Sequence, residues 1–153
     1  MSGKARVLIA EDDRSVCDLI RTHLQLSGYE VQIARDGVEA LKQVRIAKPD
    51  AMILDINMPG IDGFGVLEQL RQISPVAIPV LVLTARHAGD DVRRAIALGA
   101  RDFLAKPFSE GQLTARVARL LHIAPKVAVP AARPSSAEGT DPAQGLAERQ
   151  TAS

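Results

Sequence analysis

The side chains best suited to chemistry stand at the ends of short apolar runs. Glu11 and Asp12 follow one such run, and Asp55 ends another. Thr84 and Lys106 end two later runs. Carboxylates brought close together repel one another, and a divalent cation relieves that repulsion. Because all-oxygen ligands favour Mg²⁺, these positions predict a magnesium site with a hydroxyl and an ammonium group beside it, provided that the fold brings them together.

Five short segments, aliphatic or rich in β-branched residues, are predicted to be strands. They are 6–10, 29–34, 51–55, 80–84 and 101–105. Three of them are nearly continuous apolar runs, which is typical of parallel strands buried on both faces. Between them, apolar residues recur at helical spacing, as with Val16, Ile20 and Leu24, and capping patterns precede two of these stretches at 36–39 and 109–112. The alternation predicts an α/β fold: a (βα)5 chain with a doubly wound five-stranded parallel sheet.

In an open parallel sheet, ligands bind at the carboxyl ends of the strands. The predicted strands place Glu11, Asp12 and Asp55 at that edge, together with Thr84 and Lys106. The fold therefore gathers three carboxylates, one hydroxyl and one ammonium group from four distant places in the sequence.

Four motifs in this order resemble the receiver domain of two-component response regulators. They are Val-Leu-Ile-Ala-Glu-Asp-Asp at 7–13, Ile-Leu-Asp-Ile-Asn-Met-Pro-Gly-Ile-Asp-Gly at 53–63, Val-Leu-Thr-Ala at 82–85 and Ala-Lys-Pro-Phe at 105–108. The resemblance covers essentially residues 4–123. It implies a flavodoxin-like fold with strand order 2-1-3-4-5.

The resemblance also implies a role for each residue at this edge. Asp55 accepts a phosphoryl group from a phosphohistidine of a sensor histidine kinase or of a histidine phosphotransfer protein. Glu11, Asp12, Asp55 and the backbone carbonyl of Asn57 hold Mg²⁺, with Asp12 the more direct ligand of the two acids at 11 and 12. Lys106 pairs with the Asp55 carboxylate before transfer and with the phosphoryl oxygens afterwards. The chain is then no enzyme beyond this transfer and its own dephosphorylation.

Four further residues complete the expectations drawn from the family. Thr84 donates its hydroxyl to a phosphoryl oxygen, and Phe103 turns inward as Thr84 moves. Pro107 follows Lys106 through a cis bond, and Arg86 reaches over the site and alters the rate of dephosphorylation. The surface read by a downstream protein is formed by the fourth helix, the fifth strand and the fifth helix, and a homodimer is a further possibility.

Other readings of the same residues are less favourable. Asp13 is predicted to cap the first helix, and Cys17 to be an inert small apolar residue of that helix. A flavin-binding module would need a phosphate-cradling loop where the acidic Glu-Asp-Asp stands. A phosphatase of the haloacid-dehalogenase type would need an Asp two residues after the nucleophile, where Asn57 stands.

Composition limits the remaining classes. The net charge of +1 argues against nucleic-acid binding through a large basic face, and no uncharged apolar stretch is long enough to span a membrane. The single cysteine and the lack of an export signal favour a cytoplasmic protein. Residues 1–124 are predicted to form the receiver domain, and the Ala/Pro/Ser-rich 125–153 a flexible tail. A stand-alone receiver is favoured, and the alternative is the receiver part of a longer regulator with a separate output domain.

Overall fold

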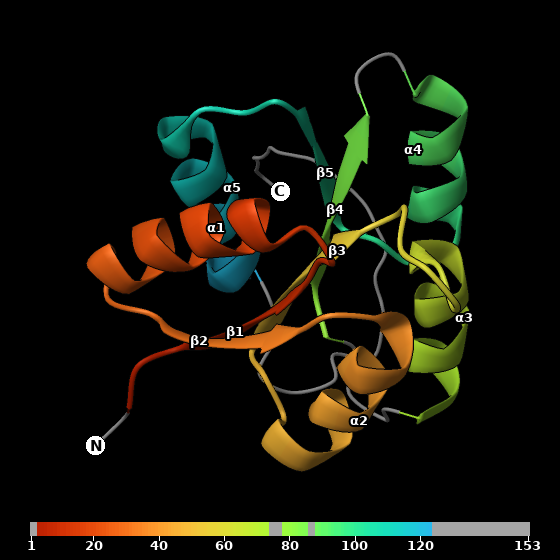
Figure 1. Ribbon diagram of the computed structural model, residues 1–153, viewed down its shortest axis with the longest axis horizontal. Coiled ribbons are helices and arrows are strands. Elements are labelled where there is room, and N and C mark those ends of the chain that lie inside the picture. Colours follow the sequence, from red (N-terminus) through yellow and green to blue (C-terminus); the bar gives the residue numbers. More distant parts are fainter. Residues whose placement is uncertain (1–2, 74–77, 86–87, 124–153) are drawn as a thin grey trace, which may run out of the picture.

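Strands and helices alternate five times along the chain in the computed structural model, which describes residues 3–73, 78–85 and 88–123 (Figure 1). The strands are β1 (Arg6–Ala10), β2 (Glu30–Ala34), β3 (Ala51–Asp55), β4 (Val80–Ala85) and β5 (Asp102–Lys106). The helices are α1 (Arg14–Leu26), α2 (Gly37–Ala47), α3 (Gly63–Ile73), α4 (Gly89–Ala97) and α5 (Glu110–Ile123).

All four strand pairings are parallel, and the sheet has the order β2-β1-β3-β4-β5. The predicted fold class and strand order are therefore confirmed. Four strand boundaries differ from the prediction by one residue: the start of β2, the end of β4 and both ends of β5. Tyr29 belongs to the turn that ends α1, because its amide donates to the carbonyl of Leu24. At the opposite edge, the pairing of Ala85 with Lys106 extends β4 by one residue and moves the end of β5 to Lys106, while β5 begins at Asp102.

The two faces of the sheet are covered by different helices. Figure 1 shows α1 and α5 on one side and α2, α3 and α4 on the other. Neighbouring residues of β1 alternate between these layers: Val7 and Ile9 pack with α1 and α5, whereas Leu8 and Ala10 pack with the other three helices. Because every residue of β3 is buried, the central strands form the rigid part of the molecule.

Polar side chains cap the starts of α1 and α5. Asp13 caps α1 as predicted, because its side chain accepts from the amides of Ser15 and Val16. At the start of α5, Ser109 and Gln112 exchange two hydrogen bonds, which is the reciprocal capping pattern predicted from the sequence. These caps tie the first turns of α1 and α5 to the loops that precede them.

The fourth helix is attached to the core by few contacts. Ala95 is its one buried residue, and Ile96 is 44% exposed. The guanidinium of Arg94 lies 4.1 Å from the centre of the Phe64 ring in α3. This cation–π contact joins α4 to α3 where apolar burial is slight.

The predicted tail, 125–153, lies outside the described residues. Within the part of the chain that the structure describes, none of the helices has the length and apolar character needed to cross a membrane.

Cys17 is expected to react slowly in the folded protein. Burial raises the pKa of its thiol from 9.0 to about 11, and its Sγ donates to the carbonyl of Glu11 at 3.1 Å. At about pH 8, a shift of this size lowers the thiolate fraction by about a hundredfold. Alkylation by iodoacetamide should therefore be at least that much slower in native than in guanidine-unfolded protein, and the native rate should rise up to about pH 11. Equal rates would contradict the burial of Cys17.

Candidate functional site

Three carboxylates meet at the carboxyl end of the sheet. Glu11 and Asp12 follow β1, and Asp55 is the last residue of β3. One oxygen from each of the three lies within 4.8 Å of the others, which is close enough for all three to hold one metal ion. Glu11 and Asp55 are 1% and 3% exposed, whereas Asp12 is open to solvent. The cluster predicted from the sequence therefore forms, with two acids inside and one at the rim.

Backbone contacts fix the position of Glu11. Its amide donates to the carbonyl of Ala34 at the end of β2, at 3.1 Å. Its side-chain Oε2 accepts from the amide of Asp13, also at 3.1 Å. The Glu11 side chain is thus held by the first residues of the loop that leads into α1.

Lys106 bridges the two buried acids. Its Nζ lies 2.9 Å from Oε1 of Glu11 and 3.3 Å from Oδ1 of Asp55. The family resemblance predicts the pairing with Asp55 and does not predict the closer contact with Glu11. The bond from Lys106 to Pro107 is cis, as the resemblance implies.

Burial and charge shift the pKa values of this pair. Burial, opposed by the hydrogen bonds from Lys106 and the Asp13 amide, raises the pKa of Glu11 from 4.5 to about 7. Burial alone would lower the pKa of Lys106, but its hydrogen bond with Glu11 and the charges of Asp55 and Glu11 outweigh that effect and raise it. Lys106 therefore stays charged near neutral pH, while the charge on Glu11 is costly.

The loop after β3 begins beside Asp55. The amide of Asn57 donates to Oδ1 of Asp55 at 3.3 Å, and Asn57 is exposed. The amide of Gly63 donates to the carbonyl of Ile56 at 2.9 Å, which closes the loop where α3 begins. Pro59 and Gly60, with a φ of 75° at Gly60, make the turn expected from the sequence.

The remaining predicted residues lie on β4 and β5. Thr84 is 2% exposed and is paired with Ala105 of β5. Phe103 is 38% exposed, and the Arg116 guanidinium lies 5.8 Å from the centre of its ring. Its aromatic side chain is thus partly open to solvent and not buried behind Thr84. Arg86 falls outside the described residues.

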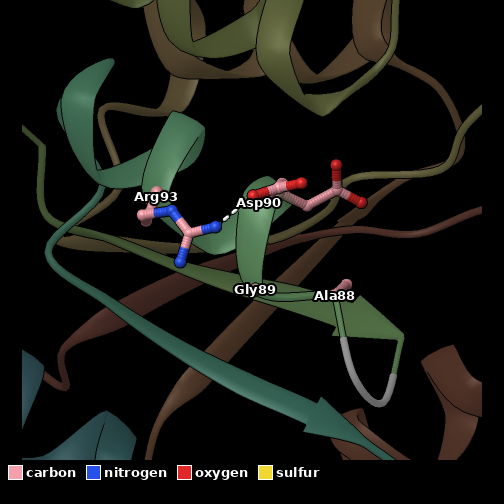
Figure 2. A pocket seen from close by; sticks show the side chains of 5 residues that line it. Ala88, Gly89, Asp90 and Arg93 are labelled. Atoms are coloured by element: carbon pink, nitrogen blue, oxygen red, sulfur yellow. Dashed lines mark hydrogen bonds and ion pairs between the residues drawn. The ribbon is translucent and has the colours of Figure 1, made fainter.

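A separate hollow lies at the start of α4 (Figure 2). It has a volume of about 360 Å³ and is lined by Ala88, Gly89, Asp90, Asp91 and Arg93. Arg93 and Asp90 form an ion pair across it. Its lining includes none of the predicted site residues, so the carboxylate cluster is the better candidate for chemistry.

Comparison with known proteins agrees with this geometry. The family model of the response regulator receiver domain matches residues 7–118. The chain belongs to this family. It is 43% identical over 116 residues to the response regulator MprA of Mycobacterium ulcerans and 44% identical to that of Mycobacterium leprae. In both cases, the match covers 76% of this chain and 50% of the relative, so the chain spans about half the length of the curated relatives that it matches.

Solved structures support the same assignment of this receiver domain. The chemotaxis response regulator CheY4 of Vibrio cholerae is 35% identical, with a TM-score of 0.73 over 77% of this chain and 99% of that one. The receiver domain of the Francisella response regulator 1452 is 32% identical, with a TM-score of 0.72 over 78% of this chain and 98% of that one. The fold and the family thus agree.

In the metal-free protein, the raised pKa of Glu11 should make the free energy of unfolding depend on pH. Since the pKa is raised on folding, the folded chain holds a proton that the unfolded chain releases between about pH 4.5 and pH 7. The stabilisation that this bound proton gives the folded state is complete below about pH 4.5 and is lost as the pH rises through 7.

Glu11→Gln removes the titrating group with little change in shape. In EDTA, the melting temperature of the wild type should fall relative to that of Glu11→Gln as the pH rises from about 5 to 8. A constant difference between the two proteins would show that Glu11 has an ordinary pKa.

Proposed function

We propose that Asp55 accepts a phosphoryl group from the phosphohistidine of a sensor histidine kinase or of a histidine phosphotransfer protein. The supporting observation is the position of Asp55, which is buried at the carboxyl edge of the sheet with Lys106 3.3 Å away and two further acids beside it. A carboxylate at such a place can act as a nucleophile towards phosphorus.

The transfer breaks the bond between phosphorus and the histidine nitrogen and forms one between phosphorus and an Asp55 oxygen. The histidine leaves neutral once its nitrogen has gained a proton. Catalysis of such a transfer depends on positioning and on electrostatic stabilisation. Lys106, already charged, moves its interaction from the Asp55 carboxylate to the phosphoryl oxygens. The hydroxyl of Thr84 donates to another of them.

The carboxylate cluster suits Mg²⁺. Its donors are oxygens, and three carboxylates within 4.8 Å carry more negative charge than Lys106 can balance. Asp12, Asp55 and the backbone carbonyl of Asn57 would hold the ion directly. Both oxygens of Glu11 already accept hydrogen bonds, from Lys106 and from the Asp13 amide, so its contact would run through water. Bound there, the ion would neutralise charge on the transferring group.

Output is proposed to occur through the surface of α4, β5 and α5, either to a downstream protein or through a homodimer. Because the chain spans about half of its relatives' length, a stand-alone receiver and the receiver part of a longer regulator remain the two candidate arrangements. In both, residues 1–124 are the receiver and 125–153 the tail or linker.

Arg86 is proposed to affect dephosphorylation, and no catalytic turnover beyond phosphotransfer and dephosphorylation is expected. The single cysteine supports a cytoplasmic location.

Phosphorylation should occur at Asp55 alone. With Mg²⁺ and acetyl phosphate, the wild type should gain one phosphoryl group that is released by hydroxylamine, as an acyl phosphate is. Asp55→Asn, which is nearly isosteric, should gain none. Peptide mapping of the label by mass spectrometry checks the site. A label on Asp13 or Asp62 would contradict the assignment.

The Thr84 hydroxyl should transmit the conformational effect of phosphorylation at Asp55 to Phe103. Shifting a two-state equilibrium from 1:99 to 99:1 takes roughly 5.5 kcal/mol, and a charge-assisted hydrogen bond supplies about 1.5–3 kcal/mol. Thr84→Ala should therefore still be phosphorylated but respond only partly around Phe103, because Lys106 supplies the rest. NMR relaxation dispersion with and without beryllofluoride measures this response.

Phe103→Leu serves as the companion variant. It should keep phosphorylation and alter affinity for whichever protein binds the activated surface. An aromatic ring at 103 that gives the same signals with and without beryllofluoride would exclude this switch.

A further inference from the structure

Ile61, in the loop after Asp55, is wedged between two helices that have glycine at the points of contact. A Cβ on Gly37, the first residue of α2, would lie 2.6 Å from the backbone oxygen of Ile61, 2.9 Å from its Cβ and 2.9 Å from Cγ2 of Val66 in α3. A Cβ on Gly65 in α3 would lie 2.7 Å from Cγ2 of Ile61. Neither glycine has a positive φ, so each supplies space and not an unusual backbone conformation.

The start of α2 cannot move aside easily. Asp36 accepts from the amide of Glu39 at 2.8 Å, and Glu39 accepts from the amide of Arg35, also at 2.8 Å. The strand just before accepts from the amide of Glu11 through the carbonyl of Ala34. The beginning of α2 is therefore tied to the same backbone that carries the first acids of the site.

The start of α3 is fixed as well. The amide of Gly63 donates to the carbonyl of Ile56, and Asp62 caps the helix by accepting from the amide of Gly65 at 2.9 Å. The segment between these two anchors is the loop 57–61. A misfit at Gly37 would thus act on the loop through Ile61, as well as on α3 through Val66, and the loop begins with Asn57 beside Asp55.

We propose that Gly37 and Gly65 are positioning residues for the phosphoacceptor site. By admitting Ile61 between α2 and α3, they hold the loop so that the amide of Asn57 meets Asp55 and its carbonyl can serve Mg²⁺. This inference rests on the proposed function of the site and adds to it two residues that touch neither the metal nor the phosphoryl group.

Binding of Mg²⁺, measured by isothermal titration calorimetry, tests the inference without any turnover. Gly37→Ala should weaken the affinity by about tenfold or more, as is usual when a residue that supports metal ligands is lost. It should also shift the Asn57 amide signal in the metal-free protein. Gly111→Ala is the matched control, because it also lies in the first turn of a helix and a Cβ there meets only Ser109 Oγ at 3.9 Å. It should bind Mg²⁺ as the wild type does.

Double variants separate the two contacts. Ile61→Ala removes Cγ2, so adding Gly65→Ala to it should weaken Mg²⁺ binding no further. The backbone oxygen and Cβ of Ile61 remain in that variant, so adding Gly37→Ala should weaken binding further. Ile61→Val keeps a methyl group at the Cγ2 position and should retain the wild-type affinity.

A general loss of stability is distinguished by Val44→Ala, a buried truncation in the second half of α2. It should lower the melting temperature and leave the affinity for Mg²⁺ unchanged. Wild-type affinity in Gly37→Ala would overturn the inference, as would an equal loss in Val44→Ala. If instead the wild type itself binds no Mg²⁺ and Asp55 is not phosphorylated, the proposed function fails, and with it the premise of this role.

Discussion

The structure depends on the placement of two buried carboxylates beside a single ammonium group. Glu11 and Asp55 are almost fully buried, and the one Lys106 is shared between them. Two negative charges against one positive charge leave an excess that is expensive wherever water is scarce. The two buried carboxylates therefore repel each other before any ligand binds. A divalent cation or an added proton would relieve this repulsion, so the proposed binding of Mg²⁺ should depend on the protonation state of Glu11.

Such a cluster needs a rigid support, which the central strands provide. β1, β3 and β4 lie between two helical layers, and their side chains alternate between two separate apolar clusters. Like charges would push a flexible chain apart, whereas a strand packed on both faces cannot yield. The strand ends and capped loops therefore fix the acids at short distances. Apolar packing far from the site thus keeps the like charges close together.

Much of this arrangement follows from local patterns in the sequence. The apolar runs predict the strands to within one residue, and the capping patterns at 36–39 and 109–112 mark helix starts by spacing alone. The gathering of Glu11, Asp12 and Asp55 follows from the rule that parallel strands end at one edge. These features depend on neighbours in the chain or on topology, and both can be read from sequence.

Other features depend on side-chain geometry between distant elements. Whether Lys106 lies nearer to Glu11 or to Asp55 is decided by a few tenths of an ångström, which no spacing rule supplies. The outward position of Phe103 beside Arg116 likewise depends on how α5 packs against β5. The roles of Gly37 and Gly65 cannot be predicted from the sequence, because a glycine does not indicate which residue packs against it in the fold.

The slight attachment of α4 has a consequence for how such a domain can acquire new partners. A helix that buries one alanine and rests partly on the stacking of Arg94 over Phe64 contributes little to the core. Most of its surface can change without lowering the stability of the sheet beneath it. Recognition at the proposed output surface would thus depend on residues of α4 that folding does not need, so substitutions there would leave the fold intact. A protein built this way can diversify what it binds while the chemistry below stays constant.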